Sequence, residues 1–178
     1  MELPYNIVLC GFMGCGKSTV GKRIARIAGL SFVDMDTYIE KQCGCTISEL
    51  FSSHGEAYFR DLEHEAARAL SREGNKVIAT GGGALTFERN VRALKQNGKI
   101  VLLDTPLPLI RERLKNDTTR PLLCRPDKDK AMQELHEQRM PVYRAAADIA
   151  VLSNATPNQV ALAVLRNLGI PCSPKEEG

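Results

Sequence analysis

The sequence predicts an α/β fold in which a parallel sheet is covered by helices on both faces. Short apolar runs alternate with segments of helical periodicity along the 178 residues, a pattern typical of parallel sheets. The first run leads directly into a glycine-rich loop and then a helix. A hydrophobic content of 43% and a charged content of 25% are those of an ordinary globular protein. We expect one domain over residues 1–170 and a disordered tail at 171–178.

Five apolar runs have the length and composition of buried strands. They are residues 5–10, 30–33, 76–79, 99–103 and 149–152. Because the segments between them carry helix signals, the runs predict a five-stranded parallel sheet. Ligands of such sheets bind beyond the carboxyl ends of the strands, so the residues that follow these runs are candidates for a site.

The intervening segments show helix signals in chain order. Gly29 is placed to end the first helix, and Thr46 and Glu49 match a capping box at the start of a later one. Pro141 is expected to kink a long helix. The expected helices are residues 20–28, 37–41, a short helix from 46, 56–70, 87–96, 108–114, 130–147 and 156–168.

The loop after the first strand matches the phosphate-binding pattern G-x-x-x-x-G-K-[ST] at residues 11–19. Its glycines let the backbone approach a ligand closely, and N–H groups at a helix N-terminus attract an anion. Lys17 adds a movable charge for the β- and γ-phosphates, and the Ser18 hydroxyl is a ligand for Mg²⁺. A chance glycine-rich turn is the alternative, but the strand and helix around the loop favour binding of a nucleoside triphosphate. The residues expected at the nucleotide are Gly14, Cys15, Gly16, Lys17, Ser18 and Thr19.

Two carboxylates follow the second strand. Asp34 and Asp36 are two residues apart, so their side chains point the same way if the strand extends that far. One carboxylate near Mg²⁺ and one near an acceptor hydroxyl would suit phosphoryl transfer to an alcohol. The alternative is that one aspartate only caps the next helix. The nearby phosphate loop favours a role in function.

Three glycines, Gly81, Gly82 and Gly83, follow the third strand. They expose backbone N–H groups to a closely approaching ligand, which suits recognition of a hydroxyl, although loop glycines without a function are also common. The carboxyl ends of parallel strands meet at one edge of the sheet. The phosphate loop, the aspartates and these glycines should therefore face one crevice.

Three arginines are candidates for ligand contacts. Arg60 lies on the helix of residues 56–70, Arg120 lies in the segment 115–130, and Arg139 lies on the helix that follows. The segment 115–130 is long and polar, which predicts a mobile lid. A lid arginine stabilises the charge of phosphoryl transfer, whereas paired arginines grip a carboxylate, and the sequence alone leaves both roles open. For Arg60 a solvated side chain with an i,i+3 partner is the alternative.

Composition and charge argue against several classes of function. A net charge of +3 without a long basic run gives no reason to expect nucleic acid or a membrane as partner. There is no apolar segment that could span a bilayer and no signal-peptide pattern. The six cysteines lack the spacing of zinc sites, so we expect reduced thiols in the cytoplasm. We also expect a monomer. His54, His64 and His136 are expected as surface helix residues.

Several motifs together resemble the shikimate kinase family. Besides the loop at residues 11–19 they are Asp34-Met35-Asp36, Gly55-Glu56-x-x-Phe59-Arg60-x-x-Glu63, Ala79-Thr80-Gly81-Gly82-Gly83, Arg120-Pro121-Leu122 and Arg139-x-Pro141-x-Tyr143. The resemblance implies a P-loop nucleoside-monophosphate-kinase-like three-layer fold with a mobile lid. It also implies ATP-dependent phosphorylation of the 3-hydroxyl of shikimate, on the path to aromatic amino acids.

The resemblance implies roles for single residues by their place in the motifs. Asp36 would orient or deprotonate the acceptor hydroxyl, and Asp34 would contact Mg²⁺ through water while Ser18 binds it directly. Arg60, oriented by Glu63, and Arg139 would hold the substrate carboxylate. The residues expected to line shikimate are Asp36, Arg60, Gly81, Gly82, Gly83 and Arg139.

The resemblance also implies which further residues contact ATP. Arg120 would reach the phosphates when the lid closes and, with Lys17 and Asp36, completes the expected catalytic set. Arg113 is a candidate for stacking on adenine. At residues 154–157, where the family has its adenine loop, the resemblance is loose.

Two alternatives stay open at the level of sequence. A kinase for another small acceptor, such as gluconate or a nucleoside monophosphate, would share the phosphate loop and the lid. The aspartate pair, Arg60 and the triple glycine favour a small carboxylated polyol. A nucleotide-dependent switch without turnover would not need Arg120, and the chain has no N-K-x-D-like guanine-specificity stretch.

Overall fold

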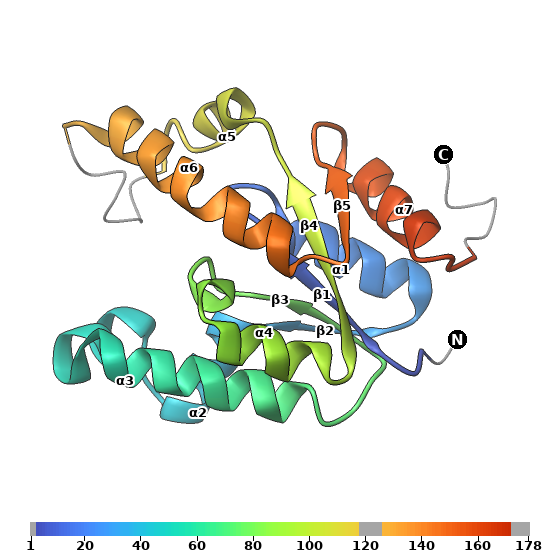
Figure 1. Cartoon of the computed structure of the whole chain (residues 1–178), viewed down its shortest axis with the longest axis horizontal. Coiled ribbons are helices and arrows are strands. Elements are labelled where there is room, and N and C mark those ends of the chain that lie inside the picture. The colour runs from blue at the N-terminus through green and yellow to red at the C-terminus, as the bar shows by residue number, and fades with distance from the viewer. Residues whose placement is uncertain (1–2, 118–125, 172–178) are drawn as a thin grey trace.

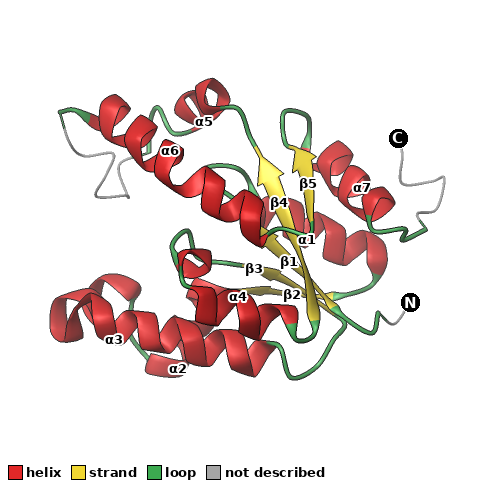
Figure 2. Ribbon diagram, in the orientation of Figure 1, coloured by secondary structure: helices red, strands yellow, loops and turns green. Residues whose placement is uncertain are grey.

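The computed structural model describes residues 3–117 and 126–171. Within these ranges five strands form one parallel sheet with the order β2–β3–β1–β4–β5 (Figures 1 and 2). The strands are β1 (Asn6–Cys10), β2 (Ser31–Asp34), β3 (Lys76–Ala79), β4 (Gly98–Asp104) and β5 (Ile149–Leu152). The predicted five-stranded parallel sheet is confirmed, and each strand lies within one residue of its expected bounds.

Helices cover both faces of this sheet, as predicted. In Figure 1, α1 and α7 lie on one side of the strands, while α3, α4 and α6 lie on the other. The helices are α1 (Lys17–Ala28), α2 (Met35–Cys43), α3 (Ile47–Leu70), α4 (Glu88–Lys95), α5 (Leu107–Arg113), α6 (Lys128–Ala146) and α7 (Pro157–Asn167). A short 3₁₀ helix, η1 (Ala84–Thr86), follows β3 and was not expected from the sequence.

The central strand β1 shows why the sheet forms where the sequence predicts it. All five of its residues are buried, and successive side chains point to opposite faces. Ile7 and Leu9 pack into the core under α1 and α7, whereas Val8 and Cys10 pack into the core on the other face. A strand covered on both faces has to be apolar at every position, so it appears in the sequence as a continuous apolar run.

The boundary between β2 and α2 differs from the sequence expectation. The strand ends at Asp34, and Asp36 lies in the first turn of α2, so the two side chains do not project from one strand. Asp34 is the N-cap of α2, and its Oδ1 accepts hydrogen bonds from the backbone N–H groups of Asp36 and Thr37 at 3.1 and 3.3 Å. This cap satisfies two N–H groups of the first turn and lets the helix begin directly after the strand.

Other boundaries need smaller corrections. The two helices expected from residue 46 and over 56–70 are one element, α3, interrupted at Gly55 with φ 80° and ψ 176°. The last residues of the expected lid belong to α6, which begins at Lys128 and continues through Pro141. The central part of that lid, residues 118–125 with Arg120, lies outside the described residues, as do residues 172–178 of the expected tail.

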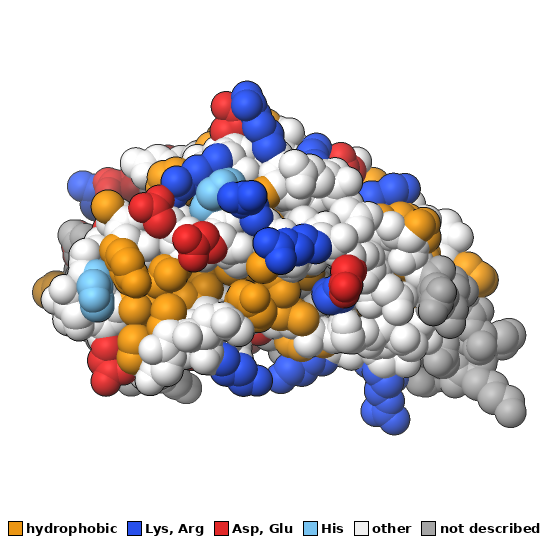
Figure 3. All heavy atoms as spheres, turned by 90° about the horizontal axis from the view of Figure 1, so that it is seen from below, with side chains coloured by type: hydrophobic (Ala, Val, Ile, Leu, Met, Phe, Trp, Pro, Cys, Tyr) orange, Lys and Arg blue, Asp and Glu red, His pale blue; other side chains and the backbone are white. Residues whose placement is uncertain are grey.

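No helix among the described residues has both the length and the apolarity that crossing a membrane requires. Figure 3 views the molecule from below, the side on which α2 and α3 lie in Figure 1, and shows apolar side chains gathered beside charged ones. Phe51 and Tyr58 of α3 are among the exposed large apolar residues, at 37% and 43% exposure.

Candidate active site

A cleft of about 950 Å³ lies beyond the carboxyl ends of the strands. It is lined by the loop between β1 and α1, by both aspartates of the β2–α2 junction, by glycines that follow β3 and by Arg139 of α6. The expectation that these features face one crevice is therefore correct. The described residues that line the cleft are Met13, Gly14, Cys15, Gly16, Lys17, Ser18, Thr19, Val20, Asp34, Asp36, Phe51, Thr80, Gly82, Gly83, Arg113, Leu114, Arg139, Ser153, Ala155, Pro157 and Val160.

The glycine-rich loop has the conformation of an anion site at a helix N-terminus. Gly14 and Gly16 have φ of 74° and 94°, values that residues with a Cβ rarely adopt, and Gly16 is the N-cap of α1. The backbone N–H groups of the first turn of α1 are thus directed into the cleft. Lys17 Nζ donates to the carbonyl oxygens of Gly11 and Phe12 at 2.8 and 3.3 Å.

Side chains from distant parts of the chain hold this loop in place. The hydroxyls of Ser153 and Thr105 donate to the carbonyl oxygen of Cys15 at 3.2 and 3.5 Å. Arg113 Nη1 donates to the carbonyl oxygen of Gly14 at 3.2 Å. The residues after β4 and β5 therefore brace the loop, a contact that no local sequence pattern indicates.

The Ser18 hydroxyl and the Asp34 carboxylate meet at the mouth of the loop. Ser18 Oγ donates to Asp34 Oδ2 at 2.7 Å, while the other oxygen of Asp34 caps α2. A hydroxyl and a carboxylate oxygen beside a phosphate site are the hard oxygen ligands that Mg²⁺ prefers, and Mg²⁺ keeps several waters of its own. Among the described residues no cluster of three or more His, Cys, Asp or Glu could hold a metal ion by itself. The pair fits Mg²⁺ that is also bound by phosphate and water.

Asp36 is half-buried and lies between charges of both signs. Burial and the neighbouring Asp34 carboxylate raise the pKa of Asp36 above its usual value, while Lys17 opposes the shift. A Cβ atom added to Gly81 would lie only 2.6 Å from Asp36 Oδ1. The carboxylate therefore sits directly against the glycine loop that follows β3.

Arg60 of α3 lies against the same loop and is held by two carboxylates. Its Nη1 donates to Glu63 at 2.6 Å, and its Nη2 and Nε donate to Glu56 at 2.8 and 3.2 Å. The i,i+3 partner considered from the sequence is present. Burial raises the pKa of Glu63, although the Arg60 guanidinium opposes the shift. A Cβ atom on Gly83 would lie 2.7 Å from Arg60 Nη1.

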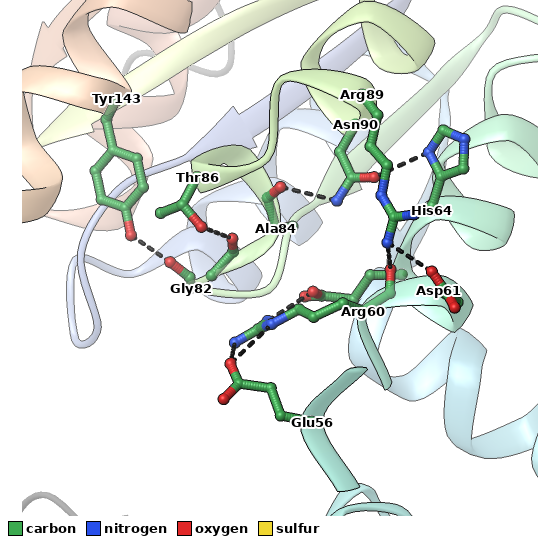
Figure 4. Close-up of polar contacts among 12 residues, drawn as sticks. Glu56, Arg60, Asp61, His64, Gly82, Ala84, Thr86, Arg89, Asn90 and Tyr143 are labelled. Carbon is green, nitrogen blue, oxygen red and sulfur yellow. Dashed lines mark hydrogen bonds and ion pairs between the residues drawn. The ribbon is translucent and has the colours of Figure 1, made fainter. Parts of the chain in front are cut away.

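Arg139 of α6 faces the middle glycine of the loop. A Cβ atom on Gly82 would lie 3.4 Å from Arg139 Nη1. One helical turn later, the Tyr143 hydroxyl donates a hydrogen bond to the carbonyl oxygen of Gly82 (Figure 4). Burial raises the pKa of Tyr143 to about 12, against the effect of Arg139, so the hydroxyl stays protonated and remains a donor.

A second set of contacts, from Thr86 and Asn90, holds the end of the glycine loop (Figure 4). Thr86 Oγ1 donates to the carbonyl oxygen of Gly83 at 2.6 Å, and Asn90 Nδ2 donates to that of Ala84 at 2.9 Å. Asn90 is fully buried, and its Oδ1 lies 3.0 Å from Nδ1 of His64. These contacts were not predicted, because most of them join residues that no local pattern relates.

The histidines differ from the expectation of plain surface residues. Only His54 is exposed, and its ring stacks on Tyr58 at 4.5 Å between centroids. His64 is half-buried against Asn90, and His136 packs edge-on against Phe12 at 5.2 Å. Burial lowers the pKa of His136, which keeps its ring neutral at neutral pH.

An aromatic cluster closes the cleft on the side of α3. Phe51 lines the cleft and packs on Phe59, with 4.7 Å between ring centroids. The Arg60 guanidinium lies over the rings of Phe59 and Phe87 at 5.5 and 5.3 Å. Ala155 and Pro157 of the segment 154–157 line the cleft together with Arg113, whose guanidinium contacts the phosphate loop at Gly14.

Comparison with known proteins identifies close relatives over nearly the whole chain. A family model described as shikimate kinase matches residues 13–169. Shikimate kinase of Thermodesulfovibrio yellowstonii is 43% identical over 161 residues, 90% of this chain and 93% of that protein. Shikimate kinase of Caldanaerobacter subterraneus is 44% identical over 161 residues, 90% and 94% of the two chains. The solved structure of shikimate kinase from Acinetobacter baumannii in complex with shikimate has a TM-score of 0.87 and 37% identity, covering 94% of each chain.

Proposed function

The chain belongs to the shikimate kinase family, and on this premise we propose that it transfers the γ-phosphoryl group of ATP to the 3-hydroxyl of shikimate. The observation that carries the proposal is the arrangement of Arg60, Arg139 and Asp36 around the glycine loop, where Arg139 and Asp36 also line the cleft that contains the phosphate loop. Two guanidinium groups suit one carboxylate, and a carboxylate nearby suits a hydroxyl. Shikimate carries both groups on one ring.

At the nucleotide end, the backbone N–H groups of residues 14–19 bind the phosphates of ATP. Lys17 exchanges its contact with the Gly11 carbonyl, now 2.8 Å long, for the β- and γ-phosphates. Arg113 stacks on adenine near Ala155, and Arg120 reaches the phosphates from the expected lid that precedes α6. The last two assignments rest on the resemblance, and Arg120 lies outside the described part of the chain.

For the metal ion, we assign Ser18 as the direct ligand and Asp34 as a ligand through water. The 2.7 Å contact between Ser18 Oγ and Asp34 Oδ2 supports this assignment, because it places both oxygens within reach of one ion. Bound Mg²⁺ would neutralise phosphate charge during transfer. Asp34 is held by the N–H groups of α2 as well, so its orientation does not depend on the ion.

At the acid end, Arg60 and Arg139 hold the carboxylate of shikimate, and the Gly82 N–H contacts the ring substituents together with Gly81 and Gly83. Asp36 accepts the proton of the 3-hydroxyl as the hydroxyl oxygen bonds to the γ-phosphorus. The bond from that phosphorus to the bridging oxygen breaks, and ADP leaves. Because burial raises the pKa of Asp36 towards the working pH, its carboxylate is a better proton acceptor than an exposed one.

The proposal is tested by following ADP formation with MgATP in the presence and absence of shikimate. A coupled pyruvate kinase and lactate dehydrogenase assay gives the rate, and phosphorus NMR of the product identifies the phosphorylated position. We expect ADP formation to depend on shikimate, with one phosphate monoester at C3. A monoester at another carbon would contradict the placement of Asp36 at the 3-hydroxyl, and no phosphorylated product would contradict the proposed activity.

A further inference from the structure

We propose that Glu56 sets the affinity of the site for its acidic substrate, because its carboxylate competes with the substrate carboxylate for Arg60. This inference rests on the proposed function, in which Arg60 binds the carboxylate of shikimate. It assigns to Glu56 a role opposite to that of Glu63, the other acidic partner of Arg60.

The contact of Glu56 with Arg60 occupies the edge of the guanidinium that a bound carboxylate would take. Glu56 Oε1 accepts from both Nη2 and Nε, at 2.8 and 3.2 Å, along one edge of the guanidinium plane (Figure 4). A carboxylate pairs with arginine along such an edge. Nη1 is already bound by Glu63 at 2.6 Å. Each of the three guanidinium nitrogens therefore donates to a glutamate before any substrate is considered.

The two glutamates differ sharply in burial. The Glu63 side chain is 1% exposed, whereas that of Glu56 is 66% exposed. A buried partner is fixed by its surroundings, but an ion pair open to water is weak and exchanges readily. Glu63 thus holds Arg60 in place, and Glu56 is the partner that an incoming carboxylate can displace.

The backbone keeps Glu56 beside Arg60. Gly55 interrupts α3 with φ 80°, and Glu56 opens the helical segment that follows. From this position the carboxylate is one helical turn before Arg60, and the N-terminal end of the segment favours its negative charge. The competitor is therefore part of the local fold and does not depend on the lid.

Charge gives the direction of the effect. Two carboxylates surround the single positive charge of Arg60. A third carboxylate is therefore bound less tightly than it would be by the guanidinium without these neighbours. Repulsion between neighbouring carboxylates in a half-exposed site changes affinity by about three- to tenfold. Removal of the Glu56 charge should therefore tighten binding of shikimate.

The test is Glu56→Gln, which keeps the length of the side chain and an acceptor oxygen but removes the charge. We expect the shikimate Kd from calorimetry and the KM for shikimate to fall about three- to tenfold, with the KM for ATP unchanged. The difference should shrink in high salt, which screens exposed charges. Glu65→Gln is the matched control: Glu65 is exposed on the same helix but lines the groove between α2 and α3, and its substitution should change neither constant.

The methyl ester of shikimate separates charge competition from other effects. This neutral ligand should bind the Glu56→Gln variant and the unchanged protein alike. An equal gain for the ester and the acid, or weaker binding of the acid by the variant, would overturn the inference. The variant Arg60→Lys distinguishes a failure of this inference from a failure of the proposed function. If that variant binds shikimate normally, Arg60 is not part of the carboxylate site at all.

Discussion

A Cβ atom on Gly81 would lie 2.6 Å from Oδ1 of Asp36, closer than non-bonded side-chain atoms approach. The same atom would lie 3.1 Å from Oε1 of Glu63, and a Cβ on Gly83 would lie 2.7 Å from Arg60 Nη1. The glycines after β3 therefore leave room for the charged side chains of Asp36, Glu63 and Arg60. None of these glycines has a positive φ in the described structure, so no unusual backbone conformation requires glycine here. What requires glycine is the close approach of the charged side chains to the loop.

Gly81→Ala should impair turnover while the fold survives. The added methyl group would push the Asp36 carboxylate away from the loop, and the atom that moves is the end of a side chain. We expect kcat to fall at least about tenfold, with the KM for ATP unchanged, since a small misplacement of a reacting group costs that much or more. Gly82→Ala is the comparison: its Cβ would meet only Arg139 Nη1, at 3.4 Å, and not Asp36, so its kcat should fall less. Equal losses in the two variants would contradict the close approach of Asp36 as the cause.

Asp36→Asn should abolish most of the turnover and leave ATP binding near normal. The amide keeps the shape of the side chain but cannot take the hydroxyl proton, so we expect a loss of about 10²- to 10⁴-fold in kcat. In the unchanged protein, kcat/KM should fall as the pH drops through the raised pKa of Asp36, because protonation removes the acceptor. Steady-state kinetics across pH measure both effects, and an unchanged kcat would eliminate the proposed role.

The same substitution should make the protein more stable at neutral pH. Because burial raises the pKa of Asp36 above its usual value of 3.8, the folded protein binds this proton more tightly than the unfolded chain does. The contribution of the carboxyl to stability is full below about pH 3.8 and is lost as the pH rises through the folded pKa. The amide of the variant cannot ionise, so thermal unfolding should give a higher Tm for Asp36→Asn at neutral pH and equal values below the usual pKa of the carboxyl. A lower Tm at neutral pH would mean that the charged form is favoured by the fold.

Arg139→Ala should mainly weaken binding of shikimate. A guanidinium that holds the carboxylate does so in the ground state and in the transition state alike, so KM should rise while kcat changes little. The loss of a charged hydrogen bond corresponds to about 1.5–3 kcal/mol, or roughly 10- to 150-fold in KM. Should only the KM for ATP change, Arg139 belongs to the nucleotide end of the cleft.

Tyr143→Phe should loosen the glycine loop without removing any group that contacts the substrate. Tyr143 is 1% exposed, and its hydroxyl holds the carbonyl oxygen of Gly82. Loss of this bond costs about 1 kcal/mol and leaves that oxygen unpaired. We expect the KM for shikimate to rise several-fold with the KM for ATP unchanged. Tyr38→Phe serves as the control, because Tyr38 lines the groove between α2 and α3, away from the glycine loop. A parallel rise in both KM values would point to a general loss of structure.

The sheet and the phosphate loop were predictable because their signals are local. A strand buried on both faces, such as residues 100–103, has to be apolar throughout. The pattern at residues 11–19 combines residue types with a strand before it and a helix after it. In both cases the physical requirement acts on consecutive residues, so one sequence suffices to reveal it.

The parts of the site that depend on tertiary contacts were not predictable in this way. From the sequence, Asp34 and Asp36 point the same way only if the strand includes both, and a helix cap was the alternative for one of them; in the structure Asp34 is that cap, and α2 starts directly after it. The bond from Tyr143 to Gly82 spans 61 residues, and the contact between His64 and Asn90 spans 26. No periodicity relates such positions. Arg60 and Glu63, by contrast, are one helical turn apart, and their pairing could be anticipated.

The most direct test of the account is the choice of acceptor. ADP release with MgATP should be measured side by side for shikimate, gluconate and a panel of nucleoside monophosphates. The account predicts turnover with shikimate alone, because only this acceptor offers a ring hydroxyl to Asp36 and a carboxylate to Arg60 and Arg139 together. Turnover with gluconate or a nucleotide in place of shikimate would contradict the assignment of the acid end of the cleft. ATP binding without turnover of any acceptor would contradict the activity itself.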